Sequence, residues 1–124
     1  MADFQEMFAE LFQLDDSMDK YEYIIDYGAV ARPVFEVKKT DSNLVTGCTS
    51  CLWVEKIDNN IQCYGESLIV QGLASMICDW WNQASIDQRS EFSLGQLTAL
   101  GLAPMLSMGR QNGVANLIAR IKKL

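Results

Sequence analysis

The sequence is organised around residues 46–54, which read Thr46-Gly47-Cys48-Thr49-Ser50-Cys51-Leu52-Trp53-Val54. Gly47 directly precedes Cys48, and because a glycine leaves the backbone free to turn, the pattern predicts a thiol displayed on a tight bend. From Cys51 onward the composition favours a strand, with Trp53 and Val54 suited to a pleated surface. We therefore expect a thiol at the mouth of a rigid sheet. That position suits a sulfur nucleophile, a metal ligand or a redox Cys-x-x-Cys.

The residues after this stretch predict a β-hairpin. We expect one strand over 51–57, a turn at Asp58-Asn59-Asn60 and a returning strand over 61–65. With a two-residue turn at Asn59-Asn60, Lys56 would pair with Cys63, and Cys63 and Cys51 would lie on opposite faces. A three-residue turn would reverse that arrangement. Upstream, residues 34–38 alternate loosely and indicate a short strand or an extended connector.

Apolar residues at helical spacing predict helices on both sides of the hairpin. A capping box of Asp3 and Glu6 opens the first, whose apolar stripe consists of Phe4, Met7, Phe8, Leu11 and Phe12. A second helix starts near Ser17, buries Met18 and Ile24 among others, and is expected to end at Gly28. The longest helix is capped by Ser67, runs to about Asn82 and is expected to be the backbone of the core. Further helices are expected from residue 85, over 92–100 and over about 107–123.

Length and charge limit the classes of function. With 124 residues, 49% of them apolar, the chain suits one domain over 1–124 with a single core. A net charge of −6 argues against nucleic acid and against an anionic membrane surface as partners. No apolar run reaches the length of a membrane helix, and the acidic N-terminus is unlike a secretory signal, so we expect a cytoplasmic protein with reduced cysteines.

Histidine does not occur in the chain. Cys–His nucleophile pairs, Ser–His–Asp triads and histidine-ligated metal sites are thereby excluded.

Four segments, in order along nearly the whole chain, resemble the SufE family of sulfur-accepting activators of cysteine desulfurases. They are Tyr23-Ile24-Ile25-Asp26-Tyr27-Gly28, the stretch from Asn43 to Val54 with its Gly47-Cys48, Gly65-Glu66-Ser67 with Ile69-Val70-x-Gly72-Leu73, and Arg110-Gln111-Asn112-Gly113. The resemblance implies an α+β fold in which a small three-stranded antiparallel sheet packs against several helices.

The resemblance also implies a mechanism. A pyridoxal-phosphate cysteine desulfurase holds sulfur as a persulfide on its own thiol, and the SufE-like cysteine, Cys48 by position, takes the outer sulfur. The sulfur then passes to a downstream scaffold protein for iron–sulfur cluster assembly. On this reading the chain is an accessory protein rather than a stand-alone enzyme, and the pyridoxal phosphate belongs to the partner, so no cofactor of its own is expected. The sequence leaves open whether the chain forms a homodimer.

Six residues are implied to support Cys48, namely Gly47, Ser50, Cys51, Trp53, Glu66 and Arg110. Two of them depart from the family pattern: Cys51 replaces a glutamine or another long polar residue, and Glu66 replaces an aspartate. Cys63 and Cys78 are expected to be buried structural thiols, because free cysteine packs as a small apolar residue.

Two rival functions remain from the residues alone. The first is a metal or iron–sulfur site that uses Cys48, Cys51, Cys63 and Cys78, although the expected hairpin register separates Cys51 from Cys63. The second is a dithiol oxidoreductase built on Cys48 and Cys51. Such enzymes place the reactive pair at a helix N-terminus, whereas a strand follows here.

Overall fold

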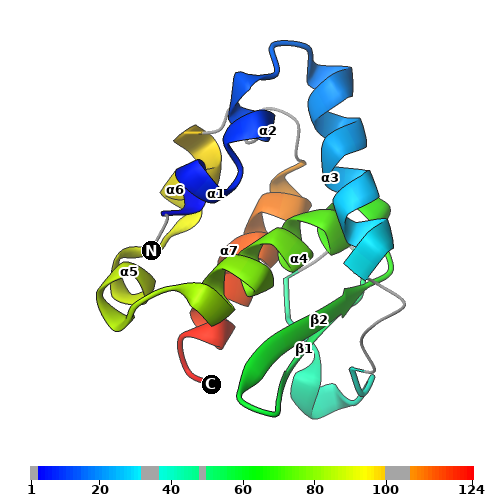
Figure 1. The fold of residues 1–124 in the computed structure, drawn as a ribbon. Helices are drawn as coiled ribbons and strands as arrows, with labels where there is room; N and C mark the ends of the chain where they lie inside the picture. Colours follow the sequence, from blue (N-terminus) through cyan, green and yellow to red (C-terminus); the bar gives the residue numbers. More distant parts are fainter. Residues whose placement is uncertain (1–2, 32–36, 48–49, 100–106) are drawn as a thin grey trace.

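The computed structural model describes residues 3–31, 37–47, 50–99 and 107–124, and the elements among them confirm an α+β fold (Figure 1). The helices are α1 (Phe4–Met7), α2 (Ala9–Gln13), α3 (Ser17–Ala31), α4 (Leu68–Gln83), α5 (Ile86–Glu91), α6 (Leu94–Ala99) and α7 (Met108–Ile121), and the strands are β1 (Leu52–Ile57) and β2 (Asn60–Gly65). Within the described ranges, none of the helices combines the length and the apolar character needed to cross a membrane.

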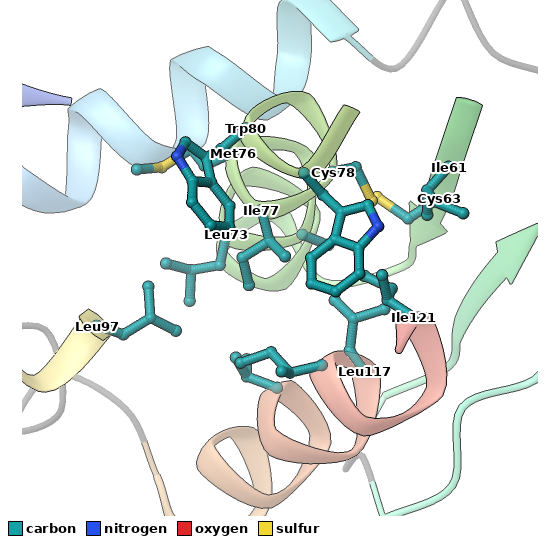
Figure 2. Close-up of a cluster of buried hydrophobic side chains, with 14 of the residues drawn as sticks. Ile61, Cys63, Leu73, Met76, Ile77, Cys78, Trp80, Leu97, Leu117 and Ile121 are labelled. Atoms are coloured by element: carbon teal, nitrogen blue, oxygen red, sulfur yellow. The ribbon is translucent and has the colours of Figure 1, made fainter. Parts of the chain in front are cut away.

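Helix α4 is the centre of the core, as its composition predicts. Its start is fixed by Ser67, whose Oγ accepts a hydrogen bond from the amide of Val70 at 3.5 Å. Nearly every residue of α4 is buried, which is typical of a helix that is apolar on all sides. Helix α4 contacts α3, β2 and α7. Figure 2 shows its Leu73 and Ile77 in the same cluster as Leu117 of α7.

Two glycines bring α3 and α4 into close contact. A Cβ on Gly72 would lie 2.0 Å from the carbonyl oxygen of Ile24, and one on Gly28 would lie 2.6 Å from the backbone nitrogen of Gly72. Only residues without a Cβ fit there, because the obstructing atoms are backbone. The prediction that Gly28 ends its helix is therefore wrong: α3 continues to Ala31, and Gly28 serves the helix crossing instead.

The sheet has two strands among the described residues, not the three that the resemblance implies. Next to β1, at the place of the expected third strand, the described residues form one isolated bridge. In it Leu44 pairs antiparallel with Trp53, and the amide of Val45 donates to the carbonyl of Leu52 at 2.8 Å. Pairing stops there because the chain turns at Thr46 and Gly47. The other candidate strand, over 34–38, lies largely outside the described residues.

The hairpin register differs from the predicted one by two residues. Asp58 and Asn59 form the turn with φ of 51° and 68°, as a tight hairpin turn requires, so Asn60 already belongs to β2 and Cys63 pairs with Val54 rather than Lys56. A shift of two keeps every side chain on its face. The expectation that Cys51 and Cys63 lie on opposite faces therefore holds: Cys63 is buried and Cys51 is exposed.

The N-terminal helices are more irregular than their periodicity predicts. The expected first helix is interrupted at Phe8, whose ψ of 38° ends α1 and begins α2. The interruption lets Phe4, Phe8 and Leu11 all reach the core, whereas Phe12, expected in the same stripe, is 51% exposed. In α3, Ile24 is buried as predicted, but Met18 is 67% exposed because it lies in the first turn, beyond the contact with α4.

Candidate functional site

A pocket of about 500 Å³ is lined in part by residues of the stretch 46–54. It is lined by Leu44, Val45, Thr46, Gly47, Ser50, Cys51 and Glu66. Cys48 and Thr49 lie outside the described residues, but Gly47 and Ser50, their neighbours in the chain, both line this pocket. Four of the six residues implied to support Cys48 thus meet at one cavity.

Helix α7 holds one wall of the pocket in place. Asn116 donates from Nδ2 to the carbonyl of Thr46 at 2.7 Å, and Arg120 donates from Nη1 to the carbonyl of Leu44 at 3.2 Å and from Nη2 to that of Ser42. Gly47 has a φ of 84°, and a Cβ there would lie 2.3 Å from Nδ2 of Asn116. The left-handed backbone favours glycine at this position, and a larger residue would also displace the Asn116 side chain.

Sequence reasoning missed Asn116 and Arg120. Their spacing of four residues places both on one face of α7, which is the available signal. Nothing local indicates that their partners are backbone carbonyls 70 or more residues earlier in the chain.

Cys51 and Glu66 are joined twice at the base of the pocket. The amide of Glu66 donates to the carbonyl of Cys51 at 3.0 Å, where the chain leaves β2 beside the start of β1. The thiol of Cys51 is also hydrogen-bonded to the carboxylate of Glu66, and this bond is the main reason why the pKa of Cys51 lies above its usual value, with partial desolvation and the negative charge acting in the same direction. Cys51 is therefore an exposed thiol whose pKa is raised by its neighbour Glu66.

Ser50 supplies a second unusual group. Its Oγ is buried and has no hydrogen-bond partner among the described residues. Buried hydroxyls are nearly always paired, so this unpaired hydroxyl distinguishes Ser50 from the other residues of the pocket wall.

Trp53 and Arg110 do not line the pocket. The ring of Trp53 lies 6.2 Å from that of Tyr64, and the ammonium of Lys39 lies 4.1 Å from the Tyr64 ring and 5.7 Å from the Trp53 ring. Arg110 donates from Nη1 to the hydroxyl of Tyr21 at 3.2 Å, which ties the first turn of α7 to α3. Trp53 still adjoins the site through its backbone bridge to Leu44.

Cys63 and Cys78 are buried, as predicted. They are 3% and 2% exposed, and Figure 2 shows Cys63 of β2 next to Cys78 of α4. A hydrogen bond between the two thiols, together with burial, raises the pKa of Cys78 well above its usual value. The described residues contain no cluster of three or more potential metal ligands, and Cys63 does not converge with Cys51.

Comparison with known proteins identifies the family. A family model described as SufE, Fe-S metabolism associated domain, matches residues 5–124. The "Cysteine desulfuration protein SufE" of Wigglesworthia glossinidia brevipalpis is 32% identical over 85% of this chain and 77% of its own length. A SufE-like protein of Rhizobium etli is 26% identical over 99% of this chain and 89% of its own length.

Two further matches extend the comparison. "SufE-like protein 1, chloroplastic/mitochondrial" of Arabidopsis thaliana is 28% identical over 92% of this chain, which corresponds to 32% of the plant protein. The solution structure of a hypothetical protein from Thermus thermophilus superposes with a TM-score of 0.71 at 16% identity, covering 97% of this chain and 90% of that one. At that identity the match shows a shared fold. Sequence and family model together show that the chain belongs to the SufE family.

Proposed function

We propose that this protein accepts sulfur from a pyridoxal-phosphate cysteine desulfurase onto Cys48 and passes it to a scaffold protein for iron–sulfur cluster assembly. The observation that carries the proposal is the pocket lined by Gly47 and Ser50, between which Cys48 lies in the sequence, together with Cys51 and Glu66. Membership of the SufE family and the name of the Wigglesworthia relative, a cysteine desulfuration protein, support it independently.

The chemistry is thiol exchange, and its atoms balance without a cofactor on this chain. The Cys48 thiolate attacks the outer sulfur of the partner's persulfide, the sulfur–sulfur bond breaks, and its electron pair leaves on the partner's cysteine thiolate. A free thiol has a pKa of about 8.5, so a few per cent is ionised at neutral pH and the reaction proceeds without a histidine base. The product is a persulfide on Cys48.

Two groups of the pocket have roles in this proposal. The unpaired hydroxyl of Ser50, two residues after Cys48, is available to donate a hydrogen bond to a sulfur atom in the pocket. The turn at Gly47, directly before Cys48 in the sequence, is held by the hydrogen bond from Asn116 to the carbonyl of Thr46. A reducing compartment such as the cytoplasm is part of the proposal, because the acceptor thiol must be free to react.

The experiment is stimulation of a cognate cysteine desulfurase, measured as sulfide released from free cysteine in the presence of a reductant. Cys48→Ser is expected to fold normally and to lose all stimulation, whereas Cys51→Ser keeps most of it. Full stimulation by Cys48→Ser would show that Cys48 is not the acceptor.

A further inference from the structure

The pocket contains a second thiol that sulfur acceptance does not require. Cys51 is exposed and lines the same cavity as Gly47 and Ser50, which flank the Cys48–Thr49 pair. A persulfide has an electrophilic sulfur–sulfur bond that any neighbouring thiolate can attack, and Cys-x-x-Cys spacing is the one at which two cysteines readily form a disulfide. A thiol at this position would therefore shorten the life of a persulfide on Cys48 unless its reactivity were restrained.

The restraint is visible in the structure. Cys51 and Glu66 line the same pocket, and a hydrogen bond to the Glu66 carboxylate raises the pKa of the Cys51 thiol, which therefore loses its proton less readily. The carboxylate is itself positioned by the backbone, because the Glu66 amide is bonded to the Cys51 carbonyl at 3.0 Å. Glu66 also directly precedes Ser67, the N-cap of α4, so it adjoins the central helix of the core.

We propose that Cys51 is a resolving thiol for the persulfide on Cys48, and that the Glu66 carboxylate restrains it and so sets how long sulfur stays on the chain. This inference rests on the proposed function. Glu66 is then a positioning residue that acts through Cys51. The reactivity of Cys51 decides whether the sulfur is retained on Cys48 or released as sulfide.

The resolving step needs no external oxidant. The Cys51 thiolate attacks the inner sulfur of the Cys48 persulfide, the bond between the two persulfide sulfurs breaks, and hydrosulfide leaves with its electron pair. The proton from the Cys51 thiol ends on that hydrosulfide, directly or through Glu66 and water. The outer sulfur is reduced to sulfide while the two cysteines are oxidised to a disulfide. A low-molecular-weight thiol then reduces the disulfide and restores both cysteines.

The size of the restraint follows from thiol reactivity. Raising a thiol's pKa by one unit lowers its thiolate fraction about tenfold. The more basic thiolate is about 3-fold more nucleophilic, so the net reaction rate falls by only about 3-fold. For each unit by which loss of the carboxylate charge lowers the pKa of Cys51, the resolving step is therefore expected to speed up about threefold.

The test compares wild type with Glu66→Gln, Cys51→Ser and the double variant. Glu22→Gln, an exposed position on α3 that does not line the pocket, is the matched control for loss of one negative charge. Each protein is loaded with a desulfurase and cysteine, separated from both, and followed by intact mass. A persulfide adds about 32 Da, and the disulfide product is about 2 Da lighter than the dithiol.

We expect Glu66→Gln to convert persulfide to disulfide faster than wild type, by about threefold for each unit by which the pKa of Cys51 falls, with an equal amount of sulfide released. Glu22→Gln should match wild type, and neither protein that lacks Cys51 should form the disulfide. An unchanged rate in Glu66→Gln overturns the role of Glu66. Equal decay of Glu66→Gln and the double variant overturns the role of Cys51. Circular dichroism of each variant verifies that the fold is intact.

A second loading route separates this inference from the proposed function. Inorganic polysulfide persulfidates exposed thiols without a desulfurase, and peptide mapping selects molecules that carry the sulfur on Cys48. If the desulfurase loads nothing but polysulfide-loaded variants decay in the expected order, the proposed function fails and the chemistry of Cys51 and Glu66 stands. If polysulfide-loaded Cys48 gives no disulfide in any variant, the inference is wrong even where the desulfurase loads the chain.

Discussion

The four cysteines form two pairs that the fold treats in opposite ways. Cys63 of β2 and Cys78 of α4 are free thiols that are hydrogen-bonded to each other and buried away from solvent. Cys48 and Cys51 belong to the stretch that turns at Gly47, and Cys51 is exposed at a pocket beside a carboxylate. The contrast shows that the exposure of a cysteine here depends on the element that carries it. The thiols on strand β2 and helix α4 are buried, whereas the thiol of Cys51, directly before strand β1, is exposed.

The comparison also separates the pocket from the core. The core around α4 contains Cys78 but not Cys51, and the pocket wall is held by hydrogen bonds from Asn116 and Arg120 of α7. Changes at the pocket should therefore alter chemistry, and changes at the buried pair should alter stability.

The largest expected effect is on thiol accessibility. We expect iodoacetamide to label Cys63 and Cys78 at least about a thousandfold more slowly than Cys51, because the buried thiols react only in molecules that open, at a cost of several kcal/mol. Peptide mapping by mass spectrometry after timed labelling measures each rate, and labelling in denaturant gives the intrinsic rates. Comparable rates for Cys63 and Cys51 in the native protein would abolish the distinction between the pairs.

The second effect is on stability. Cys78→Ser places a hydroxyl in an apolar site and is expected to lower the free energy of unfolding by about 1–3 kcal/mol. Cys51→Ser, at an exposed position, should change it by about 0.5 kcal/mol or less. Urea denaturation of both variants measures the difference. A larger loss from Cys51→Ser than from Cys78→Ser would mean that the roles of the pairs are reversed.

The smallest expected effect is on the pH dependence of Cys51 alkylation. Because the Glu66 carboxylate disfavours the thiolate, the pKa of Cys51 is raised, and alkylation of Cys51 should reach half its maximal rate at a higher pH than an ordinary thiol does. Glu66→Gln should move the midpoint to lower pH and so raise the rate at neutral pH. Alkylation profiles of wild type, Glu66→Gln and Glu22→Gln test this, and a midpoint that Glu66→Gln leaves in place would contradict the restraint.

Much of the helical part of the fold could be predicted because its signals are local. Asp3, Ser67 and Ser85 cap helices where the sequence places them, and the apolar character of α4 indicates its burial. The failures are tertiary. Gly28 is typical of a helix end, but its role is contact with Gly72, a residue 44 positions later in the chain that no local pattern connects to it.

The site was predicted in part for the same reason. Gly47, Ser50 and Cys51 lie together in the sequence, and the hairpin returns Glu66 to them, so these four could be expected to meet. Asn116 and Arg120 depend on how α7 docks, which the sequence does not reveal. Trp53 and Arg110 came from the family resemblance and lie against Tyr64 and Tyr21 rather than in the pocket.

The central claim, that Cys48 is the sulfur acceptor, is tested most directly by mass spectrometry after incubation with a cysteine desulfurase and cysteine. The account predicts a single gain of about 32 Da, mapped to the peptide that contains Cys48 and absent from Cys48→Ser. Cys63 and Cys78 should carry no added sulfur. A persulfide that forms undiminished in Cys48→Ser, or that maps to another cysteine, would contradict the account.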